Sequence, residues 1–359
     1  QQRVEILKIL YRGADILVFD EPTAVLTPQE ISELFKTFRR MKEQGKGIIF
    51  ISHKLDEVLE IADRITVIRR GKVVRELDRA EATKPLIAEL MVGKPVILNV
   101  ENPPLPPGAA VLEVEGLSLR GRGGVDALRD INFTVHSSEI YGIAGVEGNG
   151  QSDLVRAIAY KTPLKEGKVR LEGAEIQGLD VRGRRERGMA HIPEDRHKYG
   201  LLLPNSLADN FVLGSHYKKP FVNAASVQNR KAIADYARRL ISEFDVRAPS
   251  ELTPAHALSG GNQQKVIIAR EMSASPRLLL AAEPTRGVDV GATEFIYREL
   301  VEAKRGGAAV LLVSSDLDEI MSLSDRIGVM FKGRIIKEFP RGSTSKEEVG
   351  FYMMGEGAR

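Results

Sequence analysis

The sequence has 359 residues, of which 43% are hydrophobic and 28% charged, a composition typical of roughly two globular domains of about 100–200 residues each. A net charge of +3 is too small to indicate a nucleic-acid partner, and we expect none. Cysteine is absent, which excludes disulfides and thiolate metal sites. The longest apolar runs fall far short of the roughly 20 residues that cross a bilayer, so membrane association would require a protein partner.

The first predicted elements form a β-α-β unit. ILVFD (16–20) and GIIFIS (47–52) are short apolar runs rich in β-forming residues, and PQEISELFKTFRRMKEQG between them has a helical pattern. We expect the two strands to be parallel and buried on both faces. The opening QQRVEILKIL also has a helical pattern and lacks an initial Met, so we expect that the beginning of the protein is missing.

An internal repeat determines the predicted domain organisation. The first 93 residues align with the end of the chain, without a gap, at an offset of 262 residues; SHKLDEV, for example, falls on SSDLDEI. Similarity that keeps its register this long indicates a duplication. We predict that residues 1–93 are the C-terminal third of one copy, that 94–110 are a Pro-rich linker, and that 111–359 are a complete second copy.

A glycine-rich segment in the second copy predicts a phosphate site. EIYGIAGVEGNGQSDLVRAI (139–158) has the pattern of a strand, a turn and a helix, with the glycine spacing of G-x-x-x-x-G-K-[ST]. Glycines let backbone N–H groups surround phosphate oxygens, and the helix N-terminus adds positive charge. The lysine position holds glutamine, and a tight turn without a ligand is the alternative. The predicted contacts are Gly145, Gly148, Asn149, Gly150, Gln151 and Ser152.

Two further motifs resemble those of a known family. LSGGNQQK (258–265) resembles the signature motif of ABC ATPases, and ILVFDEPT (16–23) resembles their Walker B strand. The resemblance covers nearly the whole chain. It implies an α/β P-loop NTPase fold with a mixed, mainly parallel sheet and a helical subdomain, with one complete ABC domain and the C-terminal third of another. In a head-to-tail pair of domains, the signature residues would cap the nucleotide of the other copy; here they are Ser259, Gly260, Gly261 and Gln263.

The resemblance also implies which side chains act on ATP and Mg²⁺, the expected cofactors. Asp20 would lie in the Mg²⁺ shell together with a phosphate loop, where Ser152 is the metal ligand of the second copy. Glu21 would polarise the attacking water, and His53 would contact the γ-phosphate. We therefore predict that Glu21 and His53 are the catalytic residues.

The second copy lacks most of these side chains. Ala282 replaces the aspartate, Ser315 replaces the histidine, and Glu194 occupies the position of the family's Q-loop glutamine. Glu283 alone is retained. We expect the second site to hydrolyse poorly while still holding a nucleotide through Gln151 and Glu194. Because residues 1–93 contain neither a glycine-rich loop nor a signature, we expect no complete hydrolytic site in this chain alone.

The combination of PEDR, LSGGNQQK and EPTRGVDVGA resembles the ATP-binding subunit of bacterial importers for simple sugars and nucleosides, and it favours the nucleoside branch. The resemblance implies an integral-membrane permease as partner, an extracytoplasmic solute-binding protein as indirect partner, and a peripheral location at the cytoplasmic face of the membrane. Residues 195–225 resemble the region that meets the permease. The alternatives are a soluble tandem ABC protein acting on ribosomes or DNA, and a nucleotide-binding module without turnover.

Overall fold

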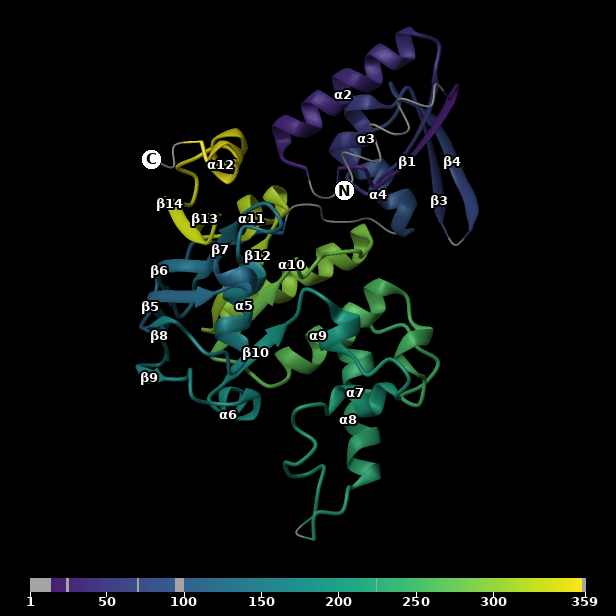
Figure 1. The fold of residues 1–359 in the computed structure, drawn as a ribbon. Helices are drawn as coiled ribbons and strands as arrows, with labels where there is room; N and C mark the ends of the chain where they lie inside the picture. The colour runs from purple at the N-terminus through teal and green to yellow at the C-terminus, as the bar shows by residue number, and fades with distance from the viewer. Residues whose placement is uncertain (1–13, 24–25, 70, 94–99, 224, 357–359) are drawn as a thin grey trace. The chain divides into compact units, whose positions relative to one another are not determined.

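A computed structural model describes residues 14–23, 26–69, 71–93, 100–223 and 225–356. The chain forms two compact units that divide between Leu98 and Asn99 (Figure 1). The predicted opening helix and residues 94–99 of the predicted linker lie outside the described residues. Asn102, from the second half of that linker, is buried in the second unit, so the chain is anchored at this point, whereas residues 106–110 are exposed.

The first unit contains the predicted β-α-β arrangement. Its first two strands, β1 and β2, are parallel. The helix between them begins after Thr27, which forms a capping box with Glu30 and so satisfies two N-terminal backbone donors. A hairpin of β3 and β4 and a last helix follow. The bounds are β1 (Ile16–Asp20), α2 (Pro28–Glu43), β2 (Gly47–Ile51), α3 (Leu55–Ile61), β3 (Arg64–Arg69), β4 (Lys72–Asp78) and α4 (Lys84–Val92).

The expectation that β1 is buried on both faces is wrong. Leu17 and Phe19 pack against α2 in a small core, but Ile16 and Val18 are 69% and 55% exposed. Among the described residues, nothing covers that face of the two-stranded sheet. The apolar pattern of the sequence indicates a strand that can be buried on both faces. Burial of both faces also requires a layer of structure on each side of the sheet.

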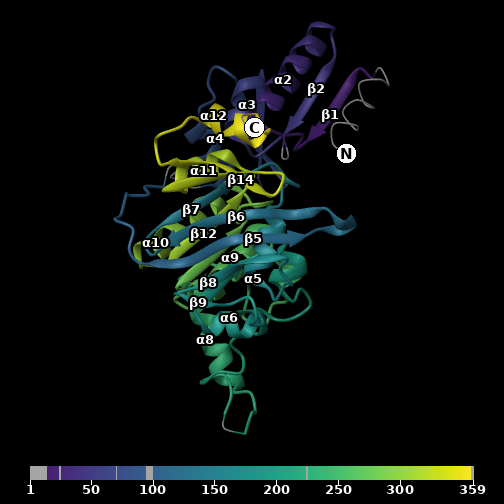
Figure 2. The ribbon, with the colours of Figure 1, turned by 60° about the vertical axis from the view of Figure 1, so that its left-hand side comes forward.

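The second unit contains two sheets. One has the strand order β10-β11-β12-β7-β13-β14, in which all pairs are parallel except β13 with β14; the other, β6-β5-β8-β9, is antiparallel (Figure 2). The mixed, mainly parallel sheet is as predicted. The strands are β5 (Ala110–Arg120), β6 (Asp126–His136), β7 (Ile140–Ala144), β8 (Glu166–Leu171), β9 (Ala174–Glu175), β10 (Met189–Ile192), β11 (Leu278–Ala282), β12 (Ala309–Ser314), β13 (Arg326–Phe331) and β14 (Arg334–Pro340).

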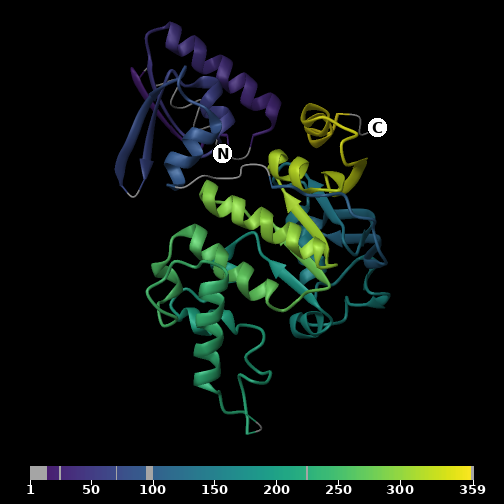
Figure 3. The same cartoon turned by 180° about the vertical axis from the view of Figure 1, so that it is seen from behind.

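Helices cover both faces of the mixed sheet. Leu278 and Leu280 of β11 face a core shared with α5 and the antiparallel sheet, whereas Leu279 faces a second core shared with α9 and α10. Helices α7 and α8 extend from this layer away from the strands (Figure 3) as the helical part of the unit. The helices are α5 (Gln151–Ala159), α6 (Val181–Glu186), α7 (Leu207–Phe211), α8 (Arg230–Glu243), α9 (Gly260–Met272), α10 (Val290–Arg305), α11 (Leu317–Leu323) and α12 (Lys346–Met353).

The duplication extends to the structure. The seven described elements of the first unit recur in the same order as β11, α10, β12, α11, β13, β14 and α12, with matching starts at the 262-residue offset. Even the irregularity in the hairpin recurs, between Val67 and Ile68 in one copy and between Val329 and Met330 in the other. In the part of the chain that the structure describes, no helix is long and apolar enough to cross a membrane.

Candidate functional site

The candidate site lies at the carboxyl end of the parallel strands in the second unit. Strand β12 pairs with β7 on one side and with β11 on the other, and β10 pairs with β11. Because parallel strands end at the same edge, the segments that follow all four strands meet there, where open α/β sheets bind ligands. These segments carry Gly145–Ser152, Glu194, Glu283 and Ser315.

The glycine-rich loop follows β7 and leads into α5. Gly148 and Gly150 have φ angles of 93° and 111°, in the region that favours glycine. At Gly145, a Cβ atom would lie 2.3 Å from Nε2 of Gln151. Asn149, predicted as a phosphate contact, accepts a hydrogen bond on its side chain from the backbone N–H of Lys332 at 3.0 Å. The Asn149 side chain thus joins this loop to the segment after β13.

Gln151 and Ser152 open helix α5 beneath this loop. Nε2 of Gln151 donates to the Val146 carbonyl at 3.1 Å, and its buried Oε1 has no hydrogen-bond partner among the described residues. The side chain therefore folds over its own loop and brings no positive charge. The Ser152 hydroxyl donates to Oε2 of Glu194 at 2.7 Å, so two of the predicted ligand residues are in direct contact.

Glu283 follows β11 in a strained backbone conformation, with φ of 45°. Its Oε1 accepts a hydrogen bond from the Ser315 backbone at 2.8 Å. Burial raises the pKa of Glu283 above its usual value, although the hydrogen bonds from Ser315 oppose this. Ala282 is buried, with no group that could bind a metal. The acid and the histidine of the first copy have no counterpart here, because Ala282 and Ser315 occupy their positions.

The first unit has the equivalent strand end and following loop, and it retains the aspartate, glutamate and histidine side chains. Glu21 follows β1 with φ of 46°, and its Oε1 lies 2.7 Å from Nδ1 of His53 and accepts from the His53 backbone at 3.1 Å. A strained non-glycine residue costs about 1–3 kcal/mol and tends to occur at functional sites. Asp20, at the end of β1, is exposed. The structure thus brings together the predicted catalytic pair, Glu21 and His53, beside Asp20.

The signature segment begins helix α9. Ser259 is its N-cap, and its Oγ accepts from the Asn262 side chain at 3.0 Å. At Gly260 a Cβ would meet the Gly287 carbonyl at 2.9 Å, which explains the glycine. Gln263 is buried, and its amide contacts the Ala255 carbonyl and Nε2 of His197. These contacts hold the Gln263 side chain within the segment, and its contact with a nucleotide stays a prediction.

Two equivalent threonine–glutamate pairs, one in each copy, were missed by the sequence analysis. The Thr23 hydroxyl donates to Oε2 of buried Glu57 at 2.5 Å, and the Thr285 hydroxyl donates to Oε1 of buried Glu319 at 2.9 Å. Burial raises the pKa of Glu319 to about 8. The only signal in the sequence is that threonine and glutamate are identical in both copies at these positions.

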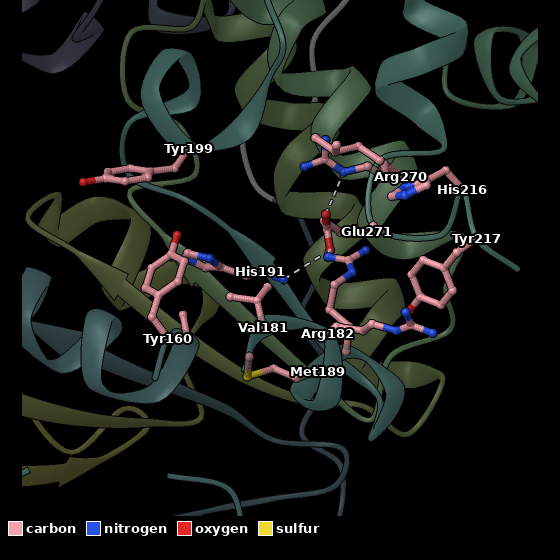
Figure 4. Close-up of a pocket in the computed structure, with 14 residues that line it drawn as sticks. Tyr160, Val181, Arg182, Met189, His191, Tyr199, His216, Tyr217, Arg270 and Glu271 are labelled. Atoms are coloured by element: carbon pink, nitrogen blue, oxygen red, sulfur yellow. Dashed lines mark hydrogen bonds and ion pairs between the residues drawn. The ribbon is translucent and has the colours of Figure 1, made fainter. Parts of the chain in front are cut away.

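A cavity of about 490 Å³ lies between the sheet and the helical part of the second unit (Figure 4). It is lined by residues of α6 and β10 together with Tyr199, Leu213 and Tyr217. The Arg182 guanidinium lies 3.7 Å from the centre of the Tyr217 ring. Part of the wall is the buried Glu271 carboxylate. Residues from the segment 195–225, which is predicted to contact the permease, thus line this cavity.

Glu271 links two helices that line this cavity, α6 and α9. It forms ion pairs with Arg185 at 2.7 Å and with Arg270 at 2.8 Å. Burial alone would raise the pKa of Glu271, but the two guanidinium groups outweigh burial and lower it. Burial lowers the pKa of His191, in the same wall, to about 4. The cavity wall therefore combines a paired ionic cluster with aromatic side chains.

Comparisons with known proteins agree with this geometry. The sequence model of the family described as ABC transporter matches residues 128–286. The chain is 50% identical over 355 residues to the guanosine import ATP-binding protein NupO of Bacillus subtilis, covering 99% of this chain and 69% of that protein. It is 46% identical to the nucleoside import ATP-binding protein NupA of Lactococcus lactis, covering 99% and 70%. The expectation of a missing beginning is not confirmed by these alignments.

The fold is also similar to solved structures. A nucleotide-free ATP-binding cassette from an ABC transporter matches with a TM-score of 0.57 and 21% identity, covering 68% of this chain and 96% of that one. Such low identity supports the fold alone, whereas the identity to the curated relatives extends over most of both chains. The chain therefore belongs to the ABC transporter ATP-binding proteins, a family of ABC-type ATPases that bind ATP.

Proposed function

We propose that the chain is the ATP-binding subunit of an importer that couples ATP binding and hydrolysis to the uptake of a nucleoside. The names of the relatives at 50% and 46% identity refer to guanosine import and nucleoside import, which favours a nucleoside over a simple sugar. The subunit would act at the cytoplasmic face of the membrane through permease subunits. A solute-binding protein would reach it only through that permease.

The observation that carries this proposal is the contact between Glu21 and His53 at 2.7 Å, which the second copy lacks. A carboxylate that orients water and a histidine near the γ-phosphate are the groups that phosphoryl transfer to water requires. Bound Mg²⁺ would neutralise charge on the phosphates, with Asp20 and Ser152 as its ligands in the two copies. Hydrolysis would therefore depend on the first copy, and the site of the second copy would be degenerate.

The two copies would work as a head-to-tail pair of ABC domains. Residues 1–93 would belong to one domain and 111–359 to the other, joined by 94–110. The N-terminus of α9, with Ser259 and Gly260, would then cap the nucleotide of the first copy through its backbone N–H groups. This explains why the signature is intact in the copy whose own side chains are reduced.

The cavity beside Tyr199 and Tyr217 is suited to the permease. Its aromatic sides offer apolar contact area, and the ion pairs of Glu271 hold its walls in a fixed shape. A short helix from a membrane subunit could place apolar side chains there. Permease binding in this cavity would thus contact β10, the strand that Glu194 follows.

The proposal is tested by producing the protein with its candidate permease and measuring uptake into membrane vesicles. We expect co-purification with the permease, ATP-dependent uptake of guanosine in preference to ribose, and loss of both uptake and ATP turnover in Glu21→Gln. A lost carboxylate that orients the water should reduce turnover by about 10²–10⁴-fold, whereas Glu283→Gln should reduce it only slightly. Co-purification with ribosomes instead of a membrane protein would contradict the proposal, as would equal effects of the two substitutions.

A further inference from the structure

Arg184 of α6 is fully buried, and it holds the carboxyl-terminal end of α5. Its Nη1 donates to the carbonyl of Ala157 at 3.3 Å and also to the carbonyl of Ile158. Its other two nitrogens donate to the carbonyls of Leu179 and Gln177 at 3.1 and 3.4 Å. The last carbonyls of a helix lack partners within it and form its negative end, which a cation stabilises. Arg184 therefore fastens the end of α5 to the segment that leads into α6.

The acceptors of these hydrogen bonds are all backbone carbonyls, and none is a carboxylate. Burial lowers the pKa of Arg184 to about 10, so the guanidinium keeps its charge at neutral pH. A buried charge is costly unless hydrogen bonds replace its lost hydration. This cation is therefore stable only while the end of α5 and residues 177–179 keep their places around it.

Both elements that this guanidinium joins also line the cavity of the second unit (Figure 4). Helix α6 contributes Val181, Arg182 and Arg185, and the end of α5 contributes Ala159 and Tyr160. A segment that fills the cavity would therefore contact α5 and α6 at the same time. Such a segment would hold the end of α5 more firmly than the guanidinium does alone.

The other end of α5 carries the glycine-rich loop. Gly150 is the N-cap of α5, and Gln151 and Ser152 begin its first turn. The nine residues of α5 span roughly 13 Å at about 1.5 Å each. Between its ends, Leu154 and Ile158 are fully buried in the core that includes β7 and β11. Because a packed helix of this length moves as a rigid element, a change in position at the cavity end reaches the loop.

We propose that α5 transmits occupancy of the cavity to the nucleotide site of the second unit, and that Arg184 is the positioning residue that makes this possible. A ligand that binds to an element already ordered by another ligand loses less conformational entropy. ATP should therefore bind the second unit more tightly when a permease segment fills the cavity, and the effect is reciprocal. The inference rests on the proposed docking of the permease in this cavity.

The test measures ATP affinity with and without the candidate permease in lipid nanodiscs. All proteins carry Glu21→Gln to suppress hydrolysis, and residues 1–93 contain no glycine-rich loop, so binding reports the second unit. In the parent, we expect the permease to raise ATP affinity by about 5-fold or more and to slow hydrogen exchange in α5. In Arg184→Met this ratio of affinities should fall to near one, because the end of α5 loses its attachment. Arg184→Lys keeps the charge but has a single nitrogen donor, so it should retain part of the ratio.

Lys304→Met is the matched control, because Lys304 is also a fully buried cation of the second unit. It pairs with Asp325, which accepts from the backbone N–H of Ile140 at the start of β7, at the edge of the sheet opposite to the loop. This variant should be less stable but keep the ratio. An equal loss of the ratio in Lys304→Met would overturn the inference, because the loss would then follow from reduced stability.

The remaining outcomes separate the inference from the proposed function. An undiminished ratio in whichever Arg184 variant folds would overturn the inference alone. A ratio of one in the parent, with permease and ATP both bound, would do the same. Failure of the parent to bind the permease or ATP would overturn the proposed function, and the inference with it.

Discussion

The Thr23 hydroxyl donates a 2.5 Å hydrogen bond to the buried carboxylate of Glu57, and the same contact recurs between Thr285 and Glu319. Thr23 lies two residues after Glu21, and Glu57 lies four residues after His53 on α3. The bond therefore joins the two loops that carry the predicted catalytic pair. Its presence in both copies indicates that this hydrogen bond belongs to the shared fold. Its effect on ATP turnover should depend on whether the copy also has the predicted catalytic side chains.

Replacing Thr23 by valine should lower ATP turnover without preventing nucleotide binding. Valine keeps the shape but removes the hydroxyl, so the loops of Glu21 and His53 can shift relative to each other. A misplacement of about 1 Å can cost 10²-fold in rate, so we expect kcat to fall by about 10- to 100-fold with little change in KM. Steady-state kinetics of the assembled importer would measure this.

Matched variants separate positioning from folding. Thr23→Ser keeps the hydroxyl and should restore most of the turnover. Thr285→Val removes the same contact in the second copy and should cost about 1–3 kcal/mol of stability by removing one of the hydrogen bonds to a buried carboxyl group, with turnover nearly unchanged. Equal losses of turnover in Thr23→Val and Thr285→Val would contradict the assignment of hydrolysis to the first copy.

Glu319 should make the stability of the second unit depend on pH. Burial raises its pKa from an ordinary value near 4.5 to about 8, so the folded state holds a proton that the unfolded chain releases. This stabilisation is complete below pH 4.5 and is lost as the pH rises to about 8, by at most about 1.4 kcal/mol per pH unit. Urea unfolding of the protein and of Glu319→Gln across this range measures it. The glutamine variant cannot titrate, so parallel pH profiles would show that Glu319 ionises normally.

Two equivalent ion pairs should differ in their effect on stability. Lys304 is fully buried, and its Nζ contacts Asp325 at 2.6 Å and Asn102 at 2.8 Å. Its counterpart Lys42 pairs with Asp63 on the surface, where the side chains are 60% and 71% exposed. Lys304→Met removes the cation nearest to Asp325, which retains Arg341 at 3.6 Å, and should cost about 3 kcal/mol. Lys42→Met should cost at most about 1 kcal/mol.

Denaturant unfolding of both variants tests this difference, with limited proteolysis as a second measurement. Because Asn102 and the carbonyl of Pro103 accept hydrogen bonds from Lys304, only Lys304→Met should expose residues 100–107 to cleavage. Similar stability losses in the two variants would mean that burial of the pair has no energetic consequence.

The sequence predicted the features that depend on pattern. The offset of 262 residues predicted the repeated elements, and the motifs predicted that Glu21 and His53 belong to one site. Contacts that depend on packing were not predictable. The amide of Gln263 could equally bind a ligand or its own segment, and its buried neighbours determine which. The partnership of Thr23 with Glu57 likewise depends on how α3 folds back over the loop after β1.

The exposed face of the first unit should make its strands exchange amide hydrogens faster than those of the second. Large apolar side chains such as Ile16 and Val18 are more than half exposed in β1, whereas their counterparts Leu278 and Leu280 are fully buried. Each buried side chain of this kind contributes about 1.5–3 kcal/mol, and a deficit of ~3 kcal/mol lowers protection about 100-fold.

Hydrogen exchange followed by mass spectrometry would compare β1 and β2 with β11 and β12, which share their hydrogen-bond pattern and strand register. The matched pairs remove differences in local geometry, so the remaining difference in protection reports the covering layer. A variant with Val18→Thr, on the exposed face, should leave the protection of β1 unchanged because no packing is lost there. Equal protection of the two strand pairs would mean that the exposed face of β1 is covered in solution, which the architecture of the described residues does not provide.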